Sequence, residues 1–386
     1  MDKHIPQKLY GLDHLRALAI LLVFLFHYFI LSGGQPGWLP GFAKFGWTGV
    51  DLFFVLSGFL ISSGLFLQIK QGQHISFSHF FLKRFFRIMP AFLVTLALYF
   101  WFPLFREKES LPPLWKFLTF TQNIGLNLKD NGTFSHAWSL CVEEHFYLLL
   151  PLLLILLQLT KGIKHAWWLP VVLFLFGFAA RLYSYKELYL PTAEDANSWV
   201  YWYRYIYYPT YNRLDGLLAG VSIAAVHRFL PAAWSRIARY GNTFIMMGLL
   251  VLTGAFYLCN DQVTFYASVW GFPLIAVGYG FLVTGAVSPS SILYKWKSKA
   301  TSFIAAISYA IYLTHKGVVH ITQLLLNDYK IDHHLVLLIC IVTCTGFACL
   351  LHFTIEDPFM KLRIRITRPD HFLTKETPVQ KINSPV

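Results

Sequence analysis

Long runs of apolar residues recur along the chain, and short polar segments separate them. A helix rises about 1.5 Å per residue, so about 20 apolar residues are needed to cross roughly 30 Å of hydrocarbon. Runs of that length predict an all-α fold, a polytopic membrane helix bundle with about ten transmembrane helices. The expected spans are 13–32, 47–67, 88–105, 137–159, 166–184, 205–227, 242–259, 263–286, 301–326 and 334–356.

The same runs lack the alternation of apolar and polar residues that is typical of strands in a membrane barrel. Helices and closed barrels are the structures that satisfy their own backbone hydrogen bonds in lipid, so the spans should be helical. Hydrophobic residues make up 56% of the chain, charged residues 13%, and the mean hydropathy is +0.51. This composition excludes an ordinary soluble globular protein.

The net charge of +13 bears on orientation. Short loops rich in Lys and Arg stay on the cytoplasmic side of a membrane, and the excess of Lys and Arg falls on that side when both termini are cytoplasmic. We predict a multi-pass protein of the cell inner (plasma) membrane, with an integral-membrane domain over 1–360 and a basic cytoplasmic tail over 361–386. Membrane lipids are expected partners, and no motif indicates nucleic-acid binding.

A basic aromatic segment precedes the third expected span. Residues 68–87 mix phenylalanines with Lys83, Arg84 and Arg87, a pattern typical of a helix that lies in the inner membrane interface. The five cysteines lie within predicted spans or at a span end and lack metal-type spacing, so we predict no metal site.

Two ionisable residues, Arg16 and His27, lie in the first span. An ionisable side chain in hydrocarbon is expensive unless it has a partner or a function. Their offset of eleven residues returns to nearly the same helix face, with about 16 Å of rise between them. The first helix should therefore carry a fixed cation near its inner end and an imidazole about three turns deeper.

Other polar residues fall at similar depths when residues are counted from the span ends. Glu143 and His315 should lie at the level of His27, and Asp51 should be slightly shallower. Arg213 and Asp215 should lie near mid-span and face roughly opposite ways, so each needs a partner on another helix.

The fourth expected span carries a polar stripe. His136, Ser139, Glu143 and Tyr147 are spaced by three, four and four residues, so they share one helix face. Glu144 should point about 100° away from that face.

Each of these residues also has a simpler interpretation. Arg16 can reach the inner interface and merely anchor its helix, and a single membrane histidine such as His315 is more often a hydrogen-bonded packing residue. Unrelated anchoring residues have no reason to gather in one half of the membrane, so we expect His27, Asp51, Glu143, Arg213 and His315 to form a functional site.

The ordered segments of the chain resemble the acyltransferase family 3, integral-membrane enzymes that O-acylate bacterial surface glycans. The resemblance covers nearly the whole chain, although Cys141, His145, Thr314 and Asp357 depart from the usual residues. The matching segments are GLDHLRALAILLVFLFHY from Gly11, GVDLFFVLSGFLIS from Gly49, KRFFRIMP from Lys83, HAWSLCVEEHFYLLLPLL from His136, RLDGLLAG from Arg213, SYAIYLTH from Ser308 and IEDPF from Ile355.

The resemblance implies transfer of an acyl group, most often acetyl, from acyl-CoA to a hydroxyl of a cell-surface polysaccharide or lipid-linked glycan. Acyl-CoA is then a donor substrate, and no cofactor is permanently bound. The expected catalytic residues are His27, Glu143 and Arg16. His27 is expected to act as general base or transient acyl carrier, and a nearby carboxylate such as Glu143 would fix its tautomer. Arg16, Lys83, Arg84 and Arg87 suit the phosphates of coenzyme A. The expected acceptor or supporting residues are Asp51, His136, Ser139, Glu144, Tyr147, Arg213, Asp215 and His315.

A membrane transporter or flippase is the alternative. In that interpretation, the buried Arg, His and Glu residues form a proton relay or an ion-paired path. No internal inverted repeat is evident in the sequence, and dependence on coenzyme A would distinguish the two functions.

Overall fold

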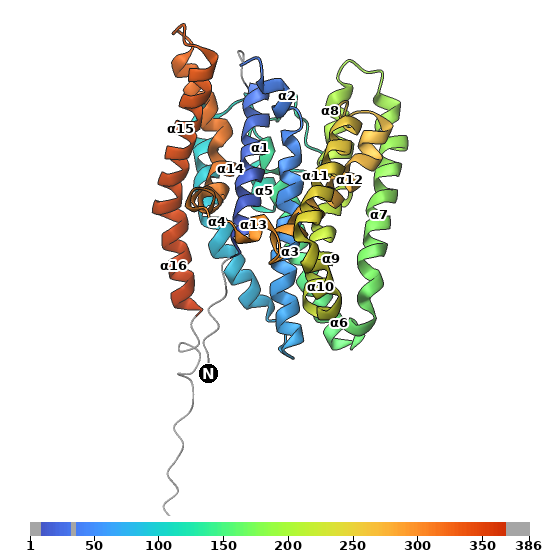
Figure 1. Ribbon diagram of the computed structural model, residues 1–386. Helices are drawn as coiled ribbons and strands as arrows, with labels where there is room; N and C mark the ends of the chain where they lie inside the picture. Colours follow the sequence, from blue (N-terminus) through green and yellow to red (C-terminus); the bar gives the residue numbers. More distant parts are fainter. Residues whose placement is uncertain (1–8, 32–35, 368–386) are drawn as a thin grey trace, which may run out of the picture.

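The computed structural model describes residues 9–31 and 36–367. Within these ranges the chain forms α-helices joined by short 3₁₀ and π turns, with no β-strand, so the all-α prediction is confirmed. The long helices run side by side, with α15 and α16 at one edge of the bundle and α7 at the other (Figure 1). The α-helices are α1 (Tyr10–Leu31), α2 (Leu39–Ala43), α3 (Gly49–Lys70), α4 (Phe77–Trp101), α5 (Leu114–Leu118), α6 (Trp138–Leu159), α7 (Leu169–Tyr183), α8 (Ser198–Trp202), α9 (Asp215–Phe229), α10 (Pro231–Ile237), α11 (Gly241–Leu258), α12 (Phe272–Ala286), α13 (Ile292–Lys295), α14 (Lys299–Leu326), α15 (His333–Leu351) and α16 (Asp357–Ile366).

Seven helical segments of the described chain are long and apolar enough to cross a membrane. The predicted count of about ten is therefore not confirmed. The other three expected spans correspond to α4, which carries several cations, to α14, which carries His315 and Lys316, and to α9, which has only 15 residues. The seven segments are Tyr10–Leu31, Gly46–Lys70, Ser135–Leu159, His165–Thr192, Pro231–Leu258, Ala267–Ala286 and His333–Ile366.

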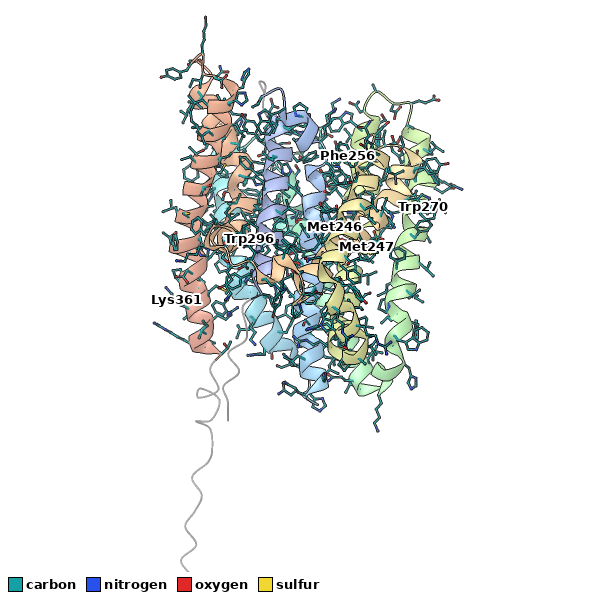
Figure 2. The ribbon with its side chains drawn as sticks, viewed as in Figure 1. Met246, Met247, Phe256, Trp270, Trp296 and Lys361 are labelled. Atoms are coloured by element: carbon teal, nitrogen blue, oxygen red, sulfur yellow. The ribbon has the colours of Figure 1, made fainter. Side chains whose placement is uncertain are left out.

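Apolar side chains cover much of the outside of the bundle. Met246 on α11 is 70% exposed, and Trp270, just before α12, is 51% exposed; both are labelled in Figure 2. Val171 and Leu175 on α7 are similarly exposed. Water disfavours so extensive an apolar surface, whereas lipid tails contact it without penalty.

The closest helix packing joins α3 to α9, and glycines make it possible. A Cβ atom on Gly58 would lie 2.2 Å from the carbonyl oxygen of Leu217, and one on Gly220 would lie 2.3 Å from that of Val55. Small residues at such an interface let two helix backbones approach in the absence of a hydrophobic driving force.

The basic aromatic segment before the third span is the first half of α4. The Ser76 side chain accepts a hydrogen bond from the backbone N–H of His79 at 3.4 Å, and the helix that starts there continues through Pro90 to Trp101. The segment is therefore not separate from the third expected span, and its position in the inner interface stays a prediction. Pro90 does not end the helix because neighbouring helices can satisfy the backbone groups that a proline frees.

The expected span 205–227 is also interrupted. A π-helical turn, η7 (Tyr203–Tyr207), and a 3₁₀ turn, η8 (Thr210–Asn212), precede α9. Pro209 lies between the two turns, where it removes a backbone donor and prevents one continuous helix. Arg213 consequently lies just outside α9, and Asp215 is its first residue.

The first helix begins and the last helix ends toward the same end of the bundle, the lower end in Figure 1. This arrangement agrees with termini on one side of the membrane, and the cytoplasmic identity of that side stays a prediction. α16 continues to Ile366, past the expected boundary at 360. The rest of the expected tail, 368–386, lies outside the described residues.

Candidate active site

A cavity of about 410 Å³ lies among α1, α3, α4, α6, α14 and α16. The four residues predicted to bind the phosphates of acyl-CoA all line it, although they come from two helices far apart in the sequence. A fifth cation, Arg363, was not predicted, because it falls within the expected tail. The cations of the cavity are Arg16, Lys83, Arg84, Arg87 and Arg363.

Glu143 is the acidic residue of this cavity. One carboxylate oxygen accepts a hydrogen bond from the Ser57 hydroxyl at 2.8 Å, and the other accepts from the Tyr147 hydroxyl at 2.9 Å. The Arg84 guanidinium lies over the Tyr147 ring, 4.9 Å from its centroid. The Tyr147 ring thus joins a carboxylate on α6 to a cation on α4, and Ser57 on α3 also binds the carboxylate.

The predicted polar stripe is present on α6. Ser139, Glu143 and Tyr147 line the same cavity, and Glu144 lines a second cavity of about 370 Å³ against α4. His136 precedes the helix in the 3₁₀ turn η3 (Ser135–Ala137). It therefore leaves the stripe and joins a different group.

Three histidine rings meet next to this cavity without lining it. His27 comes from α1, His136 from η3 and His315 from α14. His315 Nε2 lies 3.0 Å from His27 Nδ1. The centroid of the His136 ring lies 5.7 Å from that of the His27 ring and 4.9 Å from that of the His315 ring. His27 and His315 lie side by side, which agrees with their predicted common depth. Glu143 was expected beside His27, and His315 occupies that position.

Backbone carbonyls define the tautomers of neutral rings in this cluster, because a carbonyl oxygen only accepts hydrogen bonds. His315 Nδ1 lies 3.0 Å from the Ile311 oxygen and 2.8 Å from the Tyr312 oxygen, so it carries the hydrogen and Nε2 has the lone pair. His27 Nδ1, 3.0 Å from the Val23 oxygen, must then carry its own hydrogen. The remaining His27 nitrogen, Nε2, keeps a free lone pair.

Tyr312 connects the histidines to the cavity. Its hydroxyl donates to the backbone oxygen of His136 and accepts from the Ser139 hydroxyl at 2.6 Å. Tyr312 and Ser139 both line the cavity, and the Tyr312 ring lies 5.6 Å from that of His136. The cavity therefore reaches the layer of side chains that covers the histidines.

The remaining predicted residues form two buried ion pairs around α9. Arg213 binds Asp51 at 2.7 Å, and its guanidinium lies 4.1 Å from the centroid of the Phe272 ring. Arg181 binds Asp215 in the same region. Asp51 and Arg213 thus pair with each other, not with the histidines, and Arg181 is the partner that sequence analysis could not identify.

A ligand with several phosphate groups would find counter-charges in this cavity, and a reacting group beyond it would meet an imidazole with a free lone pair. Among the described residues, no group of three or more His, Cys, Asp or Glu side chains could hold a metal ion. The fold and the site define an integral-membrane helical protein with a basic cavity adjoining a histidine cluster.

Comparison with known proteins identifies the family. The model of the acyltransferase family 3, described as an acyltransferase domain, matches residues 9–353, and the chain belongs to this family. It is 27% identical to the peptidoglycan O-acetyltransferase OatA of Listeria monocytogenes over 83% of the chain, and 26% identical to the O-acetyltransferase OatA of Staphylococcus aureus (strain NCTC 8325 / PS 47) over 92%. The chain spans 50% and 58% of the lengths of these relatives. No solved structure matches it.

Proposed function

We propose that this chain is a membrane-bound O-acyltransferase. It transfers an acyl group, acetyl by analogy with its relatives, from acyl-CoA to a hydroxyl of a cell-surface polysaccharide or lipid-linked glycan. The observation that carries the proposal is the cavity with five cations that ends beside the histidine cluster. Neither relative's name favours the transporter alternative.

The basic end of the cavity suits the phosphates of coenzyme A. Arginine offers a planar pair of donors to a phosphate, and lysine adds a mobile point charge. Arg16 and His27 are separated by about 16 Å along α1, so a donor held at Arg16 would extend its acyl end toward the histidines. Water must be kept from the thioester along this path, and the buried side chains of Ser139 and Tyr312 at the inner end of the cavity favour that.

His27 suits the role of general base, because its free Nε2 lone pair can accept the proton of the acceptor hydroxyl. As the proton leaves, the hydroxyl oxygen bonds to the thioester carbonyl carbon. The carbon–sulfur bond then breaks, and the protonated His27 returns the proton to the departing sulfur. The products are the glycan ester and free coenzyme A.

His27 can instead carry the acyl group for a short time. Nε2 then attacks the thioester carbon and forms an acyl-imidazole, and coenzyme A leaves with a proton. The acceptor hydroxyl attacks this intermediate in a second step and regenerates the imidazole. Mass measurement of the protein mixed with acetyl-CoA without acceptor distinguishes the routes, because an added acetyl group appears only in the second.

We further propose that donor and acceptor approach from opposite faces. The cavity cations lie in segments that the charge distribution assigns to the cytoplasmic side, and loop 102–134, next to the histidines, would face outward. A Lys129→Cys variant tests this arrangement, because Lys129 is exposed in that loop. An impermeant thiol reagent should label it in intact cells, and labelling only after the membrane is broken would contradict the arrangement.

The central test compares wild type with His27→Ala in membranes at matched protein levels. Acetyl-CoA is the donor and the host's surface glycan the acceptor, and both coenzyme A release and glycan acetylation are measured. His74→Ala is the control, because His74 is exposed in a loop outside the cavity. Loss of both signals in His27→Ala alone supports the proposal. A wild type that consumes no donor while glycan movement depends on His27 would favour the transporter.

A further inference from the structure

A buried ion pair lies immediately behind the histidine cluster. Lys316 Nζ lies 2.6 Å from an oxygen of Glu107, and the side chains are 7% and 0% exposed. Lys316 follows His315 on α14, whereas Glu107 belongs to the loop after α4. The pair therefore ties the histidine-bearing turn of α14 to loop 102–134.

The same Glu107 oxygen also holds the chain that leads to His136. It accepts a hydrogen bond from the backbone N–H of Phe134 at 3.1 Å. Phe134 has a φ of 55°, an unfavourable value for a bulky residue, and its ring stacks on Tyr99 with centroids 4.3 Å apart. A residue in such a conformation needs its surroundings to hold it, and the carboxylate does so two residues before His136.

A second contact fixes the beginning of the loop against α14. Phe105 packs on Gly317, where a Cβ atom would lie only 2.4 Å from the phenylalanine ring. Gly317 is adjacent to Lys316, so this close approach of the loop to the helix lies beside the ion pair. Glu107 is thus held in place by packing as well as by charge.

We propose that Glu107 is a positioning residue for the acyl transfer described above. Its carboxylate positions His315 through Lys316 and positions His136 through the Phe134 N–H, so that both rings stay aligned with His27. This inference rests on the proposed function. Glu107 does not line the cavity, so its effect on the reaction passes through the histidines.

The charge of Glu107 is the property that matters most. Glu107→Gln keeps an oxygen that can accept from Phe134 but leaves the Lys316 ammonium buried without a counter-charge, which is strongly unfavourable. Lys316 should then move and displace the adjacent His315. A displacement near 1 Å at a reacting group can lower the rate about 100-fold.

The first experiment measures acetyl transfer per folded protein in wild type, Glu107→Gln and Glu109→Gln. Glu109 is an exposed glutamate of the same loop and serves as the matched control. We expect kcat to fall about 100-fold in Glu107→Gln, with an unchanged KM for acetyl-CoA, because the basic cavity is intact. An unchanged kcat, or a raised KM with normal kcat, would overturn the proposal.

The double variant Glu107→Gln with Lys316→Met distinguishes positioning from a direct role of the carboxylate. It removes the unpaired ammonium and keeps the acceptor for Phe134, so at least tenfold of the lost kcat should return. A double variant no better than Glu107→Gln would refute the proposed route through Lys316. If Glu107→Gln does not accumulate, Glu107→Asp, which keeps the charge on a shorter side chain, must lower kcat at unchanged KM.

Amide hydrogen exchange gives a readout that does not depend on acyl transfer. The peptide containing Phe134 should exchange at least tenfold faster in Glu107→Gln than in Glu109→Gln, because its amide loses a charged acceptor. Equal exchange would contradict the positioning role. If wild type transfers no acetyl group, the proposed function fails, while exchange still decides whether Glu107 holds this segment.

Discussion

The Asp51–Arg213 ion pair offers a quantitative test of the buried charges around α9. Asp51 is 3% exposed, Arg213 is 1% exposed, and the two are 2.7 Å apart. Asp51→Asn removes the counter-charge and leaves the guanidinium buried. Breaking a buried pair in this way costs about 3–5 kcal/mol. The rings of Trp138 and Phe272 contact Arg213 before and after the change, so they do not offset that cost.

A double-mutant cycle separates the pair from its surroundings. Asp51→Asn combined with Arg213→Met leaves neutral groups of similar volume, and Met can pack against the aromatic rings. We expect the double variant to regain most of the lost stability, with an interaction energy of about 2–3 kcal/mol between the two sites. Asp328→Asn, at an exposed aspartate, is the control and should change stability by less than about 0.5 kcal/mol.

Unfolding of the purified proteins in mixed micelles, followed as a function of the fraction of denaturing detergent, measures these differences. Glycan acetylation by the same variants, normalised to folded protein, shows whether the pair serves more than stability. A loss below about 1 kcal/mol in Asp51→Asn would refute the argument. Simple addition of the two single losses in the double variant would also refute it, because additive effects mean no direct interaction.

Three further predictions concern the cavity, the histidines and the helix interface. Arg84→Gln should raise the KM for acetyl-CoA about tenfold or more, because it removes a charged contact to a phosphate. Arg239→Gln, which lies outside the cavity, should leave this KM unchanged, and steady-state kinetics measures both values. His315→Phe should lower kcat about 100-fold at unchanged KM, because the His27 Nδ1–H loses His315 Nε2 as an acceptor and the reacting ring is less firmly positioned; an unchanged kcat would exclude that role. Gly58→Ala should lower the free energy of unfolding by about 1–3 kcal/mol, because the added methyl group clashes with the α9 backbone. Gly64→Ala on the same helix should leave the free energy of unfolding unchanged, because a Cβ atom there meets no atom within 4 Å.

Local sequence patterns were enough to predict which residues of a single helix share a face, but not every residue of the cavity, since Arg363 was missed. The offset between Arg16 and His27 and the spacing of Ser139, Glu143 and Tyr147 follow from the geometry of one helix. The structure brings the predicted cations and this stripe to one cavity. Helical periodicity therefore predicts which side chains share a face.

Contacts between helices were beyond the reach of the same patterns. His27 could be assigned a depth but not a neighbour, so Glu143 was expected where His315 lies. Glu107 gave no signal, because it lies in a polar loop where a glutamate is ordinary, and its importance depends on a lysine 209 positions further along the chain. A partner choice of this kind depends on tertiary packing, which one sequence without aligned relatives does not reveal.

The boundary between the cavity and the histidine cluster constrains the proposed reaction. Tyr312 and Ser139 line the cavity and bond to each other, while the histidines lie beyond them. In the proposed reaction, the acyl group passes beside this pair of hydroxyls on its way from Arg16 to His27. The Tyr312 hydroxyl also binds the backbone of His136, so a rotation of this hydroxyl as the acyl group passes would release one histidine. Donor entry and the alignment of the reacting groups are therefore coupled through Tyr312 in the proposed mechanism.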